Sequence, residues 1–147
     1  MNQALLQFNT LLKVHTRIYG DKKYYLAADY KNIGTCELAL WRYDKAKESY
    51  NKAEEYVQMG LEDDDLTEEE LKEERTQLAS IYFNLYLCHL GKGEKDEALG
   101  FNDKCLAINI DILGPTDLNV GNNYHNAASI HYDRFEIKTA KEYSDKA

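Results

Sequence analysis

Three asparagines at matching positions are the residues of this chain best suited to recognising another molecule. Asn32, Asn84 and Asn126 each stand two residues after a tyrosine. A carboxamide carries donors and an acceptor, so it can pair with the backbone amide and carbonyl of an extended peptide whatever that peptide's side chains are. The alternative is a hydrogen bond to a neighbouring helix. Because asparagine is a mediocre helix former, three of them at one position need one of these causes.

The asparagines belong to a repeating pattern that must position them. An alanine follows 16 residues after each of the three tyrosines, and a half copy containing Ala4 precedes them. The four alanines, Ala4, Ala46, Ala98 and Ala140, are separated by 42, 52 and 42 residues. Repeats this short cannot bury a core alone and must stack on one another. Stacking would place the three asparagines in a row on one surface.

Composition and periodicity predict about seven helices in a single all-α array over residues 1–147. The chain has 1 proline and 8 glycines, too few for a fold with many turns. We expect an orphan second helix in 1–20, a repeat in 24–59, an acidic insert and helix start in 60–75, a repeat in 76–113 and a truncated repeat in 115–147. The expected helices are a first one with an apolar stripe from Leu5 to Ile18 that ends at Gly20, then Tyr25–Leu40, Tyr43–Met59, a helix capped by Thr67 that reaches about Leu90, Glu94–Leu113, a helix from near Pro115 to about Tyr132, and a last one from Glu136. The segment Gly60–Leu66 is expected to be a loop.

The pattern resembles the tetratricopeptide repeat. The first copy matches best, with Tyr30, Gly34, Tyr43, Ala46, Tyr50 and Ala53, whereas the second copy departs from the pattern at Tyr86 and Cys105. The 42-residue period, the Leu113-Gly114-Pro115 linker and the residue pairs that begin with the three asparagines look like the kinesin light chain variety. The resemblance implies an α-solenoid of antiparallel helix pairs, wound as a right-handed superhelix, in which the first helix of each pair lines a concave groove. In such repeats matching asparagines contact peptide backbone, and we carry this role to the three asparagines.

Residues three and four positions from these asparagines share their helix face. The predicted peptide-binding residues are Lys31, Asn32, Thr35, Phe83, Asn84, Leu87, His125, Asn126, Ser129 and Tyr132. Ala28, Leu38, Ser80, Leu90 and Asn122 fall on the same faces. Phe83, Leu87, Leu90 and Tyr132 are expected either to form walls of apolar pockets or to pack between repeats. Lys31 and His125 slightly favour an acidic ligand.

Charge and cysteine usage exclude several classes of function. The formal charge of −8 resides in Glu62–Glu74, where 1 lysine and 9 acids sum to 1 − 9 = −8. This segment is expected to be a solvated surface or, alternatively, a dock for a basic partner. The sequence contains no basic stripe of the kind that binds nucleic acid or an anionic membrane, so neither is expected as a partner. Cys36, Cys88 and Cys105 are expected to be free thiols in a reducing, cytoplasmic setting, since we find no signal peptide and no membrane span. We find no phosphate loop, nucleophile motif or zinc signature, and so predict no enzyme, cofactor or metal.

Three functions remain open at this point. The first is an adaptor that reversibly captures linear peptides or a partner segment in its groove. The second is a structural subunit permanently embedded in a larger assembly, with its unpaired first helix and short last helix covered by a partner or by further repeats. The third, suggested by the resemblance alone, is a motor-cargo module.

Overall fold

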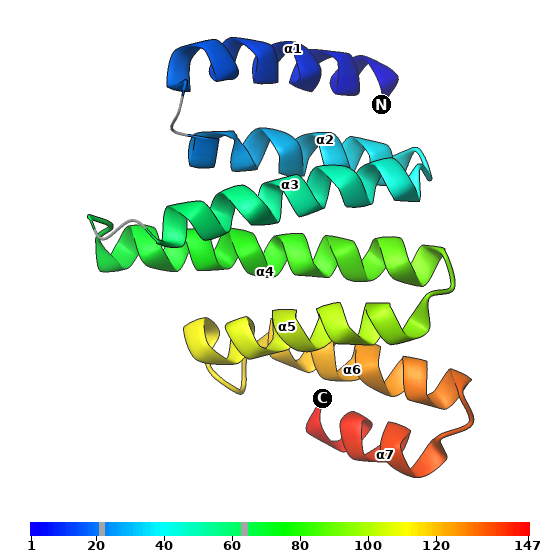
Figure 1. Cartoon of the computed structure of the whole chain (residues 1–147). Coiled ribbons are helices and arrows are strands. Elements are labelled where there is room, and N and C mark those ends of the chain that lie inside the picture. Colours follow the sequence, from blue (N-terminus) through cyan, green and yellow to red (C-terminus); the bar gives the residue numbers. More distant parts are fainter. Residues whose placement is uncertain (21–22, 63–64) are drawn as a thin grey trace.

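The chain forms one stack of helices laid side by side (Figure 1). The computed structural model describes residues 1–20, 23–62 and 65–147; residues 21, 22, 63 and 64, and with them Asp63 and Asp64 of the acidic segment, lie outside the described part. Within the described residues there are seven α-helices, one short 3₁₀ helix and no strand. They are α1 (Asn2–Tyr19), η1 (Lys23–Leu26), α2 (Ala27–Ala39), α3 (Tyr43–Leu61), α4 (Glu68–Gly91), α5 (Lys95–Leu113), α6 (Leu118–Asp133) and α7 (Ile137–Lys146). The predicted all-α solenoid is confirmed.

The helices form antiparallel pairs, α2 with α3, α4 with α5 and α6 with α7, and α1 packs beside α2 ahead of the first pair (Figure 1). We call the first helix of each pair an A helix and the second a B helix, so that α1 is a B helix. Each A helix ends in the same turn. A left-handed residue closes the turn: Trp41 at φ 59°, Gly93 at φ 77° or Phe135 at φ 61°. In all three turns the backbone amide of the next residue donates to the carbonyl five positions before that residue. The bonds run from Arg42 to Glu37, from Glu94 to His89 and from Glu136 to His131.

The repeated alanines lie where paired helices approach closely. Ala46 and Ala98 are fully buried and Ala140 nearly so. Gly34 serves the same purpose in the first pair, because a Cβ added there would lie 2.8 Å from the ring of Tyr50. Tyr50 itself is completely buried, and its hydroxyl donates to Thr35 Oγ1 at 3.2 Å. The tyrosine-rich composition is therefore used partly to fill space between helices, with hydroxyl groups bonded at the rim.

Local signals place most helix ends correctly, with three corrections. Thr67 and Glu70 form the predicted capping box at the start of α4. The first turn of the second helix is 3₁₀ rather than α-helical. Gly60 belongs to α3, which continues to Leu61, so the loop begins later than predicted. Pro115 does not start α6; the chain turns first, and Asp117 caps the helix by accepting a hydrogen bond from the Asn119 amide at 2.8 Å.

Candidate peptide-binding groove

All ten predicted site residues lie on the three A helices and reach the surface. Thr35, Phe83, His125, Ser129 and Tyr132 are exposed, and the other five are half-buried. Each of these helices therefore presents its predicted residues at least partly to solvent. Whether a peptide contacts them remains a prediction.

The three matching asparagines have different surroundings. Within the described part of the chain, the side chains of Asn32 and Asn84 make no hydrogen bond. Asn126 Nδ2 donates to Asn102 Oδ1 of α5 across a long 3.5 Å. Thus two carboxamides are free to pair with a ligand, and the third combines both roles that the sequence left open.

A cavity of about 460 Å³ lies between α4, α5 and α6. The backbones of α2 and α4 come into contact, whereas α4 and α6, both described in full, do not. The cavity occupies this wider interval between A helices. Its lining residues are Thr76, Ala79, Ser80, Phe83, Cys105, Asn109, Ile112, Leu113, Asn119, Asn122, Asn123 and Asn126.

Only Phe83 and Asn126 of the predicted site residues line this cavity, together with Ser80 and Asn122 of the same predicted faces. The predicted pocket walls Leu87, Leu90 and Tyr132 do not. None of the lining residues is charged, and neither Lys31 nor His125 is among them, so the cavity has none of the expected positive character. Asn119 is the functional candidate that sequence reasoning missed. The spacing of Asn119, Asn122 and Asn126, which places them on one helix face, was a signal that could have found it.

A buried asparagine cluster supports the floor of the cavity. Asn123 Nδ2 donates to Asn102 Oδ1 at 3.1 Å, and Asn109 Nδ2 donates to Asn123 Oδ1 at 2.8 Å. Asn102 Nδ2 in turn donates to the backbone carbonyl of Asn123 at 3.0 Å. These bonds join α5 to α6 and fix the orientation of α6, and with it the direction in which Asn119, Asn122 and Asn126 project.

The Asn109–Asn123 contact lies at a position that recurs wherever a B helix packs against the A helix of the next pair, an interface that we call a seam. Counting from the repeated alanines and tyrosines, the equivalent pairs are His15 with Asp29 between α1 and α2, and Val57 with Ile81 between α3 and α4. His15 Nδ1 and Asp29 Oδ2 are 2.7 Å apart. Val57 and Ile81 are both fully buried in the central core. One seam is therefore sealed by an acid–histidine pair, one by apolar contact and one by carboxamides.

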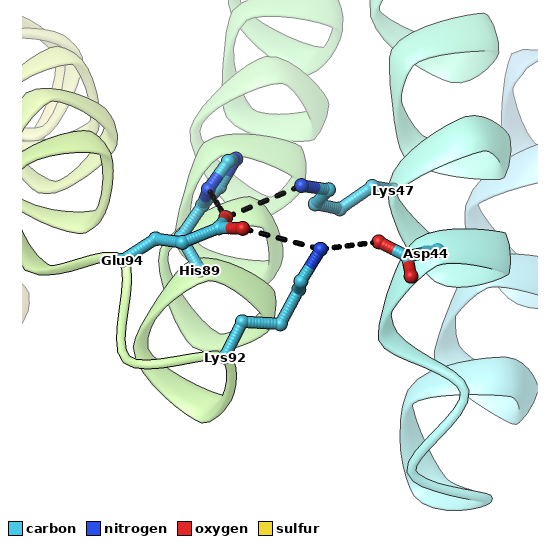
Figure 2. A network of polar contacts seen from close by, with 5 residues as sticks. All are labelled: Asp44, Lys47, His89, Lys92 and Glu94. Carbon is cyan, nitrogen blue, oxygen red and sulfur yellow. Dashed lines mark hydrogen bonds and ion pairs between the residues drawn. The ribbon is translucent and has the colours of Figure 1, made fainter.

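An ion-pair network joins the first part of α3 to the turn between α4 and α5 (Figure 2). Lys92 contacts both Glu94, at 3.1 Å, and Asp44 of α3, at 2.5 Å. Lys47 and His89 also reach Glu94, at 3.3 Å and 2.6 Å. The hydrogen bond from Lys92 holds the pKa of the Glu94 carboxyl at about 2, below its usual 4.5. This arrangement links neighbouring repeats.

The cysteines are buried and take no part in the candidate site's polar surface. All three described thiols are free. Burial raises the pKa of the Cys88 thiol to about 11, which keeps it protonated and unreactive at neutral pH. Cys105 lines the apolar part of the cavity, with its Sγ 3.5 Å from Asn109 Nδ2. Cys36 and Cys88 are both buried and act as small side chains in the helix packing.

Two further properties of the described residues bear on the chemistry. No three His, Cys, Asp or Glu side chains among them come together in a way that could hold a metal ion. No helix in the described part combines the length and apolarity needed to cross a membrane.

Comparison with known proteins supports the architecture. No family model and no curated protein sequence matches the chain. Among solved structures, the crystal structure of BtubC (BKLC) from P. vanneervenii is similar, with a TM-score of 0.51 and 14% sequence identity; the match covers 99% of this chain and 71% of that one. At this identity the likeness concerns the fold alone. The chain is an all-α protein built of stacked helical repeats.

Proposed function

We propose that this chain is a non-enzymatic interaction module that binds an extended segment of a partner protein along α2, α4 and α6. The observation that carries this proposal is the uncharged cavity between α4, α5 and α6, which is lined by the exposed residues Asn119 and Asn122 of α6 and Phe83 of α4. The resemblance to tetratricopeptide repeats of the kinesin light chain variety supports the same function.

The lining suits a peptide with one apolar side chain. Carboxamides pair with the amides and carbonyls of an extended backbone. Each such bond contributes roughly 0.5–1.5 kcal/mol net, whereas association costs roughly 4–15 kcal/mol. Polar contacts alone are therefore insufficient. An apolar side chain buried against Phe83, Ile112 and Leu113 adds roughly 2 kcal/mol. We expect micromolar affinity for a short peptide.

Random-peptide display on the intact chain provides the test. Selected peptides are measured against the wild type and an Asn122→Ala/Asn126→Ala variant, and we expect at least a tenfold loss of affinity in the variant. Asn51→Ala is the matched control, because Asn51 is an exposed asparagine of α3 outside the cavity. Unchanged affinity in the double variant would refute the groove assignment.

Asn84→Ala distinguishes a ligand that runs along all three matching asparagines from a ligand that binds only in the cavity. Asn84 belongs to the row of matching asparagines but does not line the cavity. A ligand that follows the whole row loses affinity when Asn84 is replaced, whereas a ligand confined to the cavity does not. Circular dichroism of each variant checks that helicity is retained.

A structural subunit of a larger assembly is the alternative function. It is favoured by large apolar side chains that face solvent outside the groove, including Trp41 at 77% exposure and Phe135 at 89%. Gel filtration of the isolated chain distinguishes the two. A well-folded monomer supports the adaptor, and aggregation that a partner relieves supports the subunit.

A further inference from the structure

Helix α1 presents an apolar strip that no other described element covers. Leu11, Val14 and Ile18 lie on one helix face, and their exposed fractions are 40%, 46% and 67%. No residue of α1 is buried, although α1 is 18 residues long. We call these three residues the α1 strip.

The other B helices show what normally covers this face. Residues 42 or 94 positions later in the sequence occupy the same register, which matches Leu11 to Ala53 and Cys105. Ala53 is 0% exposed and Cys105 3% exposed. Both sit in helices that pack against an A helix of their own pair. The α1 strip is thus the counterpart of a face that is covered by an A helix in α3 and α5, and no A helix covers it among the described residues.

The charge pattern of α1 restricts the chemistry of a covering helix. In the complete pair, Arg75 of α4 and Asp111 of α5 form an ion pair at 2.6 Å. Asp111 corresponds in register to Arg17 of α1. A helix that takes the place of α4 against α1 therefore needs an acid where α4 has Arg75. Helix α1 contains Lys13 and Arg17 but no acidic residue, which favours an acidic partner along its whole length.

We propose that the α1 strip binds an acidic amphipathic helix of a partner protein, packed antiparallel to α1 in the way that α4 packs against α5. This surface is separate from the groove of α2, α4 and α6, so the inference stands independently of the proposed function. A second copy of the chain fits poorly. The helix at the other end of the stack, α7, carries Lys138, Lys141 and Lys146 against two acids and would meet the cations of α1 with like charge.

The test uses two synthetic peptides of residues 68–91, one with the natural Arg75 and one with Arg75→Glu, both with Cys88→Ser. Each is titrated into the intact chain and into an Arg17→Glu variant. The Arg75→Glu peptide is expected to bind the wild type about fivefold more tightly than the natural peptide does, and this preference is expected to reverse in the Arg17→Glu variant. Hydrogen exchange of residues 2–19 is expected to slow on binding.

Two further variants make the result specific. Lys13→Glu changes the charge of α1 by the same amount at another register, so it should alter the affinity for both peptides without reversing the preference. Val14→Asp should weaken both peptides at least tenfold. The proposal is overturned if no combination protects α1, if protection appears in α5 instead, or if the preference is the same in wild type and Arg17→Glu. Self-association of the peptide-free chain that Val14→Asp abolishes would assign the strip to a second copy and overturn it as well.

Discussion

Replacing Asn123 with isoleucine tests how the seam between α5 and α6 is held. Asn123 is 2% exposed and uses both ends of its carboxamide, donating to Asn102 at 3.1 Å and accepting from Asn109 at 2.8 Å. The equivalent slot between α3 and α4 holds Val57 and Ile81. The double change Asn109→Val/Asn123→Ile therefore installs a pair that this fold already accommodates.

The expected losses of stability follow from the side chains that each substitution leaves without a hydrogen-bond partner. Asn123→Ile leaves Asn102 Oδ1 with a single 3.5 Å contact to Asn126 and leaves Asn109 Nδ2 with only the Cys105 sulfur. A buried polar group without a partner costs about 1–3 kcal/mol. We expect a loss of about 3 kcal/mol in the free energy of unfolding for Asn123→Ile. Asn109→Val leaves Asn123 Oδ1 with only the long 3.9 Å hydrogen bond from Cys105 Sγ and should cost about 2 kcal/mol by the same reasoning.

The free energy of unfolding of Asn109→Val/Asn123→Ile should fall by only about 2 kcal/mol. In this variant an apolar pair replaces a hydrogen-bonded pair, and only the Asn102 side chain loses a hydrogen-bond partner. Urea unfolding followed by circular dichroism measures all four proteins. A loss of 3 kcal/mol corresponds to a midpoint shift of about 1.5 M at a slope of about 2 kcal/mol/M. Asn51→Ala should stay within about 0.5 kcal/mol of the wild type. If the single effects simply add in the double variant, the two asparagines do not depend on each other and the reasoning fails.

Three further predictions concern other parts of the stack. Gly34→Ala should lower the free energy of unfolding by about 1–3 kcal/mol in urea titrations, because its Cβ would lie 2.8 Å from the Tyr50 ring; an unchanged midpoint would contradict this close approach. Gly93→Ala should cost about 1 kcal/mol, because alanine must adopt φ 77° there, and a stabilised variant would show that the turn relaxes. Folding depresses the pKa of Glu94 from 4.5 to about 2, so this stabilisation is complete above pH 4.5 and is lost as the pH falls towards 2. Lys92→Met should flatten that part of the stability–pH curve, whereas a curve parallel to that of the wild type would argue against the network.

The fold could be predicted from sequence because its signals are local and repeated. The alanine spacing gives the pairing of helices, and glycine, threonine and acidic residues mark helix ends through backbone chemistry that needs no tertiary context. The start of α6 was placed too early because Pro115 is compatible with a first helical turn. The hydrogen bond from the Asn119 amide to Asp117 decides the actual start, and Asp117, a favoured N-cap residue, was the signal that the prediction passed over.

The candidate site was only partly predictable for a different reason. Periodicity assigns a residue to a helix face, and all ten predicted residues lie on the A helices. It does not give the distance between neighbouring repeats, which depends on how B-helix side chains pack at each seam. The interval between α4 and α6 is wider than that between α2 and α4, and the cavity forms there. A uniform row of three asparagines was therefore expected, whereas the polar lining is concentrated at α6.

The uneven spacing of the A helices has a mechanical consequence. In a stack whose units touch only their neighbours, deformation is divided among the seams according to their stiffness. The α4–α6 interval has a hollow where the α2–α4 interval has contact, so bending or stretching of the stack is concentrated there. A ligand that fills the cavity would stiffen this interval, and the curvature of the helix stack would then depend on whether the ligand is bound.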